Sequence, residues 1–213
     1  MAVRNIIFDF GGVLLNIDYQ KTTNAFEKLG GNNFKNLYSA SHQTELFDRF
    51  EIGEITSEEF LKEIRGLLKI NDVSTRELIK AWTAMLISFP KQNLLLLKEL
   101  AKTYNLYILS NTNEIHVSVF EKLIEKNCAF FEFKNLFKQI YWSCEIHYRK
   151  PDAVCFLSVI NDNKLNPKET IFIDDSLQNI KAAQKIGITS YLLERNANID
   201  SLLKNNGFLK ARN

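Results

Sequence analysis

Polar residues able to do chemistry stand at or shortly after the ends of short apolar runs: Asp9, Ser110, Asn111, Lys150, Asp174 and Asp175. Taken singly, an aspartate or serine in such a position is usually a helix cap or a turn residue. Together they supply carboxylates that can attack or bind a hard metal ion, a lysine that balances negative charge, and a hydroxyl that donates to an oxyanion. We therefore interpret these residues as one candidate site.

The apolar runs have the length and composition of strands buried on both faces. The first covers residues 3–8, and the others cover 106–109, 137–142, 170–173 and 189–193. Segments of helical spacing separate the last four runs. Because strands that alternate with helices make right-handed crossovers, we predict a doubly wound, Rossmann-like α/β core with a parallel sheet. Such sheets bind ligands outside the carboxyl ends of their strands, where the candidate residues stand.

The long segment between the first two strands has a different pattern. It has helical spacing and polar faces, with a capping box at Thr56 and Glu59 and no convincing strand. We predict a small all-helical cap domain over residues 16–86, inserted after the first strand. The α/β core then comprises residues 1–15 and 87–213.

The composition excludes several classes of function. The chain has 213 residues with a formal net charge of +2, so neither nucleic acid nor an acidic membrane is an expected partner. No apolar stretch is long enough to span a bilayer, and residues 1–8 lack the regions of a signal peptide. The three cysteines have no metal-type spacing, which favours a reducing compartment. We predict a cytoplasmic monomer or homodimer.

The order of the polar segments resembles that of the haloacid dehalogenase superfamily, most of whose members are phosphatases. The matching segments are Phe-Asp-Phe-Gly-Gly-Val-Leu at 8–14, Leu-Ser-Asn-Thr-Asn at 109–113, Arg-Lys-Pro at 149–151, and Ile-Asp-Asp at 173–175 with Asn179. They follow the family order across essentially the whole chain, and the helical insert lies where that family has its cap. Within the superfamily, the chain looks similar to the bacterial sugar-phosphate phosphatases typified by the α-D-glucose-1-phosphate phosphatase.

The resemblance implies covalent catalysis with Mg²⁺. Asp9 would be the nucleophile and form an aspartyl-phosphate, which divides hydrolysis into two easier steps. The implied Mg²⁺ ligands are Asp9, the backbone carbonyl of Gly11, Asp174 and Asp175. Two adjacent carboxylates at a strand end repel each other without a cation, and this favours the metal over a helix cap as their role.

The resemblance also implies a phosphate-binding set. Lys150 would balance the charge of the nucleophile and of the transferring phosphoryl group. Ser110 would donate to a phosphoryl oxygen, with Asn111 beside it in the same substrate-binding loop. Asn179 would brace the acidic loop and not touch the substrate.

One position departs from the family pattern. Most phosphatases of the superfamily carry a general-acid aspartate where this chain has Gly11. Three explanations are open. An anomeric sugar phosphate needs little acid assistance; another residue substitutes; or the protein is slow or not catalytic. The candidate substitutes are Asp18, His42, Glu51 and His147.

The predicted function is a Mg²⁺-dependent phosphatase of a small phosphorylated metabolite, specifically a sugar phosphate. A haloacid dehalogenase is the alternative enzyme, but it would attack carbon without a metal, and the presence of both Asp174 and Asp175 argues against it. A phospholigand-binding protein without catalysis is a further alternative, and Gly11 keeps it open. Tyr19, Phe47, Phe50 and Trp82 could line a sugar-sized pocket, although aromatic residues at helical spacing are more often core.

Overall fold

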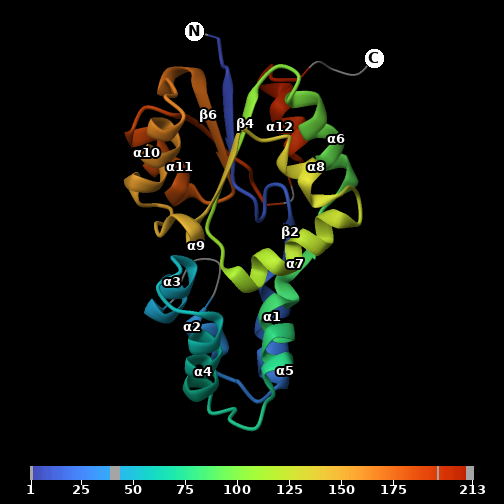
Figure 1. Cartoon of the computed structure of the whole chain (residues 1–213), viewed down its shortest axis with the longest axis vertical. Coiled ribbons are helices and arrows are strands. Elements are labelled where there is room, and N and C mark those ends of the chain that lie inside the picture. The colour runs from blue at the N-terminus through green and yellow to red at the C-terminus, as the bar shows by residue number, and fades with distance from the viewer. Residues whose placement is uncertain (1, 39–43, 196, 210–213) are drawn as a thin grey trace.

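A five-stranded parallel sheet with the strand order β5-β4-β1-β6-β7 forms the centre of the protein (Figure 1). The structure is a computed structural model and describes residues 2–38, 44–195 and 197–209. The strands are β1 (Asn5–Phe8), β4 (Asn105–Ser110), β5 (Gln139–Trp142), β6 (Thr170–Asp174) and β7 (Thr189–Leu192). All four neighbouring pairs are parallel, and the predicted doubly wound α/β fold is confirmed.

Helices cover both faces of this sheet (Figure 1). One face carries α6 (Lys91–Leu100), α7 (Glu114–Glu125), α8 (Phe130–Lys134) and α12 (Ile199–Asn205); the other carries α10 (Ala153–Asp162) and α11 (Leu177–Lys185). Along β1, Ile6 and Phe8 pack into the first layer and Ile7 into the second. This alternation with period two buries both faces, which explains why the strand is apolar throughout.

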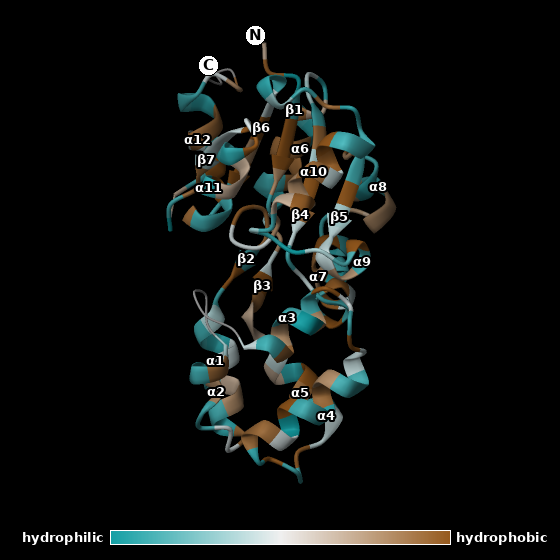
Figure 2. Ribbon diagram, turned by 90° about the vertical axis from the view of Figure 1, so that its left-hand side faces the viewer, coloured by the Kyte–Doolittle hydropathy of each residue, from teal (hydrophilic) through white to brown (hydrophobic). Residues whose placement is uncertain are grey.

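The cap segment lies beyond the carboxyl ends of the strands and has its own apolar core (Figure 2). It consists of α1 (Tyr19–Lys28), α2 (Phe34–Leu37), α3 (Glu45–Glu51), α4 (Ser57–Leu68), α5 (Thr75–Trp82) and the 3₁₀ helix η1 (Thr83–Met85). Phe26, Phe34, Phe47, Phe60 and Trp82 are among its fully buried side chains. The capping box at Thr56 and Glu59 is present and begins α4, as the sequence predicts.

A short antiparallel ribbon joins the cap segment to the sheet. Its strands are β2 (Asn16–Ile17) and β3 (Leu86–Ser88), and just beyond them the Asp18 N–H donates to the Met85 carbonyl at 2.9 Å. The expectation of no strand over residues 16–86 is wrong at both of its ends. Strands of two and three residues are too short to produce an alternating pattern.

Two short elements complete the fold: α9 (Ser143–Ile146) after β5, and the 3₁₀ helix η2 (Pro167–Glu169) before β6. The three cysteines, Cys128, Cys144 and Cys155, are free thiols. In the part of the chain that the structure describes, no helix combines the length and apolarity needed to cross a bilayer.

Candidate active site

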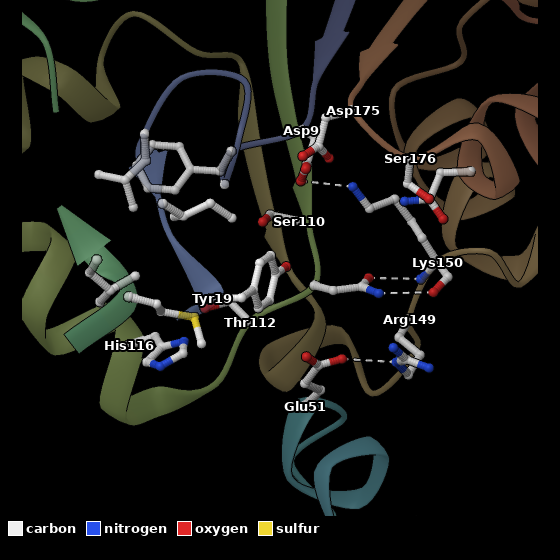
Figure 3. A pocket seen from close by; sticks show the side chains of 18 of the residues that line it. Asp9, Tyr19, Glu51, Ser110, Thr112, His116, Arg149, Lys150, Asp175 and Ser176 are labelled. Atoms are coloured by element: carbon white, nitrogen blue, oxygen red, sulfur yellow. Dashed lines mark hydrogen bonds and ion pairs between the residues drawn. The ribbon is translucent and has the colours of Figure 1, made fainter. Parts of the chain in front are cut away.

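The predicted residues meet at the carboxyl edge of the sheet, between it and the cap segment (Figure 3). Asp9 directly follows β1, Ser110 ends β4, Asp174 ends β6, and Lys150 lies in the loop before α10. A cavity of about 450 Å³ opens there, and Asp9, Ser110, Lys150 and Asp175 line it. Parallel strands bring these side chains together because their carboxyl ends share one edge.

Lys150 lies between two carboxylates at the base of the cavity. Its Nζ is 2.8 Å from Asp9 Oδ1 and 2.7 Å from Asp174 Oδ2, and the side chain is 1% exposed. Burial by itself would lower the pKa of Lys150, but the charges of Asp174 and Asp9 outweigh it and raise the pKa above its usual range. The lysine therefore remains a cation at neutral pH.

Asp174 is fully buried and surrounded by hydrogen-bond donors. Besides Lys150, it accepts from the Ser176 N–H at 2.7 Å and from Asn179 Nδ2, which is 3.1 Å from each carboxylate oxygen. Asn179 thus braces the acidic loop, as expected from the sequence. These donors hold the Asp174 carboxylate in one orientation.

The carboxylates of Asp9, Asp174 and Asp175 form a cluster that fits a divalent cation. Oxygen atoms of the three groups lie within 4.8 Å of one another. Burial raises the pKa of Asp9 to about 7 and that of Asp175 to about 6, and the neighbouring carboxylates add to both shifts. Among the described residues, none donates to the buried Asn179 Oδ1. One lysine cannot balance three carboxylates, and such hard oxygen donors suit Mg²⁺.

The glycine loop after Asp9 shapes the rim of this cluster. Gly12 has a φ of +80°, and a Cβ there would lie 2.2 Å from Asp175 Oδ2, so the close approach of Asp175 requires glycine. Gly11 lines the cavity, and a Cβ on it would meet Ile17 Cδ1 at 3.4 Å. The side chain of Ile17 therefore lies next to the position of Gly11, where most phosphatases of the haloacid dehalogenase superfamily carry the general-acid aspartate.

Asn111 connects two of the predicted segments. Its Nδ2 donates to the Lys150 carbonyl and its Oδ1 accepts from the Lys150 N–H, both at 2.8 Å. The amide thereby positions the backbone of the lysine across the cavity. Asn111 also lines the cavity, and its substrate contact stays a prediction.

Comparison with known proteins identifies the family. The profile of the haloacid dehalogenase-like hydrolase family matches residues 6–193. The chain belongs to this family. The resemblance inferred from the four sequence segments is thereby confirmed, and with it the prediction of a hydrolase.

Several members of the haloacid dehalogenase-like family are similar over nearly the whole chain. D-ribitol-5-phosphate phosphatase of Bacteroides thetaiotaomicron is 31% identical over 195 residues, which are 92% of this chain and 94% of that protein. A family enzyme of the same bacterium, crystallised as an aspartate-to-alanine mutant with magnesium and inorganic phosphate, has a TM-score of 0.87 at 33% identity, covering 95% and 99% of the two chains.

Two further solved structures share the fold of this hydrolase. A predicted family hydrolase of Porphyromonas gingivalis has a TM-score of 0.85 at 25% identity, covering 97% of this chain and 99% of that chain. An L-2-haloacid dehalogenase has a TM-score of 0.60 at 16% identity, covering 92% and 88%. At that identity, the similarity to the dehalogenase concerns the fold alone.

The structure separates the candidate substitutes for the general acid of this hydrolase. Asp18 caps α1 by accepting from the Gln20 N–H at 3.0 Å, and it does not line the cavity. His147 bonds through Nδ1 to the Ile52 carbonyl at 2.9 Å and is also absent from the cavity wall. His42 lies outside the described residues. Glu51 does line the cavity.

Several cavity residues were missed by the sequence analysis. Asp48 and Arg149 line the cavity, and Arg149 binds Asp48 at 2.8 Å and Glu51 at 2.9 Å. The only signal for Arg149 was its place directly before Lys150. Tyr19 is the one predicted aromatic residue on the cavity wall; burial and nearby carboxylates raise its pKa, so its hydroxyl stays protonated.

His116 is a buried imidazole that connects α7 to the cap segment of the hydrolase. Its Nε2 is 3.2 Å from the Trp82 carbonyl, and the two rings stack with centroids 4.7 Å apart. Burial lowers the pKa of His116 to about 4. The ring is therefore neutral at pH 7, with Nε2–H donating to the carbonyl.

We expect acid to destabilise the protein through His116. His116 binds a proton near pH 6.5 in the unfolded chain and only near pH 4 in the folded protein. The contribution of the neutral imidazole to the free energy of unfolding is therefore complete above pH 6.5 and is lost as the pH falls from 6.5 to 4. The loss is on the order of 3 kcal/mol. His116→Gln, whose amide can also donate to the Trp82 carbonyl, should weaken the pH dependence of the unfolding free energy in urea titrations. His147→Gln, an exposed control, should keep it; equal slopes in wild type and His116→Gln would contradict the prediction.

Proposed function

We propose that this hydrolase is a Mg²⁺-dependent phosphatase of small phosphorylated metabolites, with a sugar or polyol phosphate as substrate. One observation carries the proposal. A buried, charged Lys150 contacts both Asp9 and Asp174 beside a third carboxylate, at the base of a cavity of about 450 Å³. This arrangement suits a phosphate dianion, which needs a nucleophile, a cationic partner and a metal in one place.

In the proposed mechanism, Asp9 is the catalytic nucleophile. Its carboxylate oxygen attacks phosphorus, the bond from phosphorus to the ester oxygen breaks, and the sugar oxygen leaves with the electron pair and takes a proton from solvent water. Water then attacks the phosphorus of the aspartyl-phosphate, which releases inorganic phosphate and restores the carboxylate. Burial raises the pKa of Asp9 to about 7 although Lys150 lies beside it, and a bound metal ion would lower this pKa and favour the carboxylate form that attacks.

The metal would be held by Asp9, the carbonyl of Gly11, Asp174 and Asp175. When bound, Mg²⁺ neutralises charge on the phosphoryl oxygens and orients the group for attack. Asn179 would position Asp174 for the metal, because its Nδ2 lies 3.1 Å from each oxygen of that carboxylate.

Lys150 and Ser110 would stabilise the transferring phosphoryl group. Lys150 Nζ can donate three hydrogen bonds, and two of them go to Asp9 and Asp174. Ser110 is 3% exposed and faces the cavity beside Asp9 (Figure 3). Asn111 would act through Lys150 as a positioning residue, since its amide holds the backbone of that lysine.

Two findings support a sugar or polyol phosphate. The similar phosphatase of Bacteroides thetaiotaomicron is named for D-ribitol 5-phosphate. The cavity also combines an apolar wall, with Leu15, Ile17 and Met85, and a wall rich in hydrogen-bonding groups. Such a mixed cavity fits a small polyhydroxylated ester.

The decisive experiment is a phosphate-release screen over phosphorylated metabolites, with Mg²⁺ and with EDTA. We expect release from sugar and polyol phosphates with Mg²⁺, loss in EDTA, and recovery when Mg²⁺ is added back. Full activity in EDTA would refute the metal site. Chloride release from 2-chloropropionate would assign the dehalogenase reaction instead, and binding without turnover in all conditions would assign a phospholigand-binding protein.

Because Gly11 stands where a general acid is usual, we predict that an aspartate introduced there accelerates hydrolysis. Gly11→Asp should raise kcat for alkyl phosphates, which have poor leaving groups, by about 10-fold or more, because an acid there can protonate the leaving oxygen. The backbone at Gly11 is not left-handed, and a Cβ would make only an ordinary contact at 3.4 Å with Ile17. The same variant should change aryl phosphate hydrolysis little. Gly11→Asn is the matched control; an equal gain in both variants would exclude proton donation as the cause.

A further inference from the structure

Glu51 and Arg149 lie at the end of the cavity opposite Asp9 and Asp175 (Figure 3), and Asp48, which is bonded to Arg149, also lines the cavity. We call them the distal cluster: Asp48 and Glu51 of α3, and Arg149. The guanidinium Nη1 is 2.8 Å from Asp48 Oδ1, and Nε is 2.9 Å from Glu51 Oε2. The Glu51 side chain is only 9% exposed, so its carboxylate is a wall of the cavity and not part of the outer surface.

The backbone around Glu51 is attached to the core at two points. The Ser143 hydroxyl lies 2.6 Å from the Glu51 carbonyl, and His147 Nδ1 lies 2.9 Å from the Ile52 carbonyl. A Cβ on Gly53 would lie 2.4 Å from the Cys144 carbonyl, which shows how closely the backbone segments around these two residues approach each other. Glu51 is thus held in place before a substrate enters, and little entropy is lost when a ligand binds to it.

The charge of the distal cluster decides what it can bind. Two carboxylates and one guanidinium carry a net negative charge, and a carboxylate accepts hydrogen bonds but donates none. Hydroxyl groups of a substrate can donate to Glu51 and Asp48 while those residues keep their bonds to Arg149. The net negative charge of the distal cluster would repel a second phosphate or a carboxylate group of the substrate, and partial desolvation of the cavity would strengthen this repulsion. The protonated Tyr19 hydroxyl, between the nucleophile and Glu51, adds a neutral hydrogen-bonding group (Figure 3).

We propose that the distal cluster selects phosphate esters whose far end carries neutral hydroxyl groups and rejects those with an anionic far end. Glu51 and Asp48 are the specificity-determining residues, and Arg149 positions them. The inference rests on the proposed phosphatase function and narrows its substrate class from sugar and polyol phosphates in general to those that carry no charge besides the phosphate ester.

A matched pair of substrates tests the proposal. Glucitol 6-phosphate and 6-phosphogluconate share the phosphate ester and the chain length, and differ in the hydroxymethyl or carboxylate group at carbon 1. We expect kcat/KM to favour the glucitol ester by at least about 10-fold, and mainly through KM. Glu51→Gln and Asp48→Asn should each reduce this ratio by at least about fivefold, since each removes one negative charge. The ratio is insensitive to a general loss of activity.

Glu54→Gln is the control, because Glu54 belongs to the same segment but is exposed, pairs with Arg49 and is outside the cavity. It should leave both the ratio and the rate unchanged. Equal kcat/KM for the two esters in the wild type, or a ratio that neither cavity variant changes, would overturn the proposal. A preference for glucosamine 6-phosphate over both would also overturn it, since the cluster would then recognise a cation. If no phosphate monoester, p-nitrophenyl phosphate included, is hydrolysed with Mg²⁺, the proposed function fails first.

Discussion

Asp9→Asn is expected to lower kcat by at least about 10⁴-fold, because an amide cannot form the aspartyl-phosphate. The substitution keeps the shape of the side chain and one oxygen for the metal. It also removes a buried carboxylate whose pKa is already raised to about 7 by burial, so the fold should not suffer. Inorganic phosphate and Mg²⁺ should therefore still bind, and the loss should appear in kcat and not in the dissociation constants.

Two measurements check this result for Asp9. Wild-type protein mixed with radiolabelled substrate and quenched in acid should retain labelled phosphate, and the variant should retain none. Asp152→Asn makes the same chemical change at an exposed position near Lys150 and should match the wild type in both assays. A variant at Asp9 that keeps even a tenth of the wild-type rate would mean that another group, or water itself, attacks phosphorus.

Lys150→Met should lower kcat/KM by about 10²- to 10³-fold, the usual effect of removing one preorganised electrostatic partner of a transition state. The change also leaves Asp9 and Asp174 without the cation that lies 2.8 and 2.7 Å from them. Without metal, the variant should therefore be less stable than the wild type. Added Mg²⁺ should restore more stability to the variant than to the wild type, because it supplies the missing positive charge.

Thermal unfolding with EDTA and with Mg²⁺, together with steady-state kinetics, tests this prediction. Lys185→Met removes an exposed lysine from α11 and should change neither the midpoint nor the rate. If Lys150→Met lost activity but responded to Mg²⁺ like the wild type, the two carboxylates would not depend on the lysine for their stability, and its role would be confined to the substrate.

The sequence predicted the sheet and the residues at its edge well, and the reason is geometric. Strands buried on both faces are continuous apolar runs, and parallel strands bring Asp9, Ser110 and Asp174 to one edge whatever the loops do. The polar residue that ends such a run is therefore placed by the fold class alone.

The far end of the cavity could not be predicted in the same way. Arg149 and Glu51 are 98 residues apart in the chain, and they meet only because the cap segment docks against the loop before Lys150. That docking depends on contacts such as the one between Ser143 and Glu51, which have no sequence periodicity. The hydrogen bonds between the Asn111 amide and the backbone of Lys150 could not be predicted either, because they too join residues far apart in the sequence.

The ribbon of β2 and β3 has a consequence for how such a protein can change. Asn16 Nδ2 donates to Ser88 Oγ at 3.1 Å, so the chain leaves the sheet and returns to it at nearly the same point. Residues 17–87 therefore connect two neighbouring points of the core in the way that a hairpin turn connects two strands, and the length of this segment hardly affects the position of those points. Insertions, losses or exchanges of helices there need not move Asp9 or Lys150. Natural selection can therefore redesign the choice of substrate and leave the cleavage of the phosphate bond untouched.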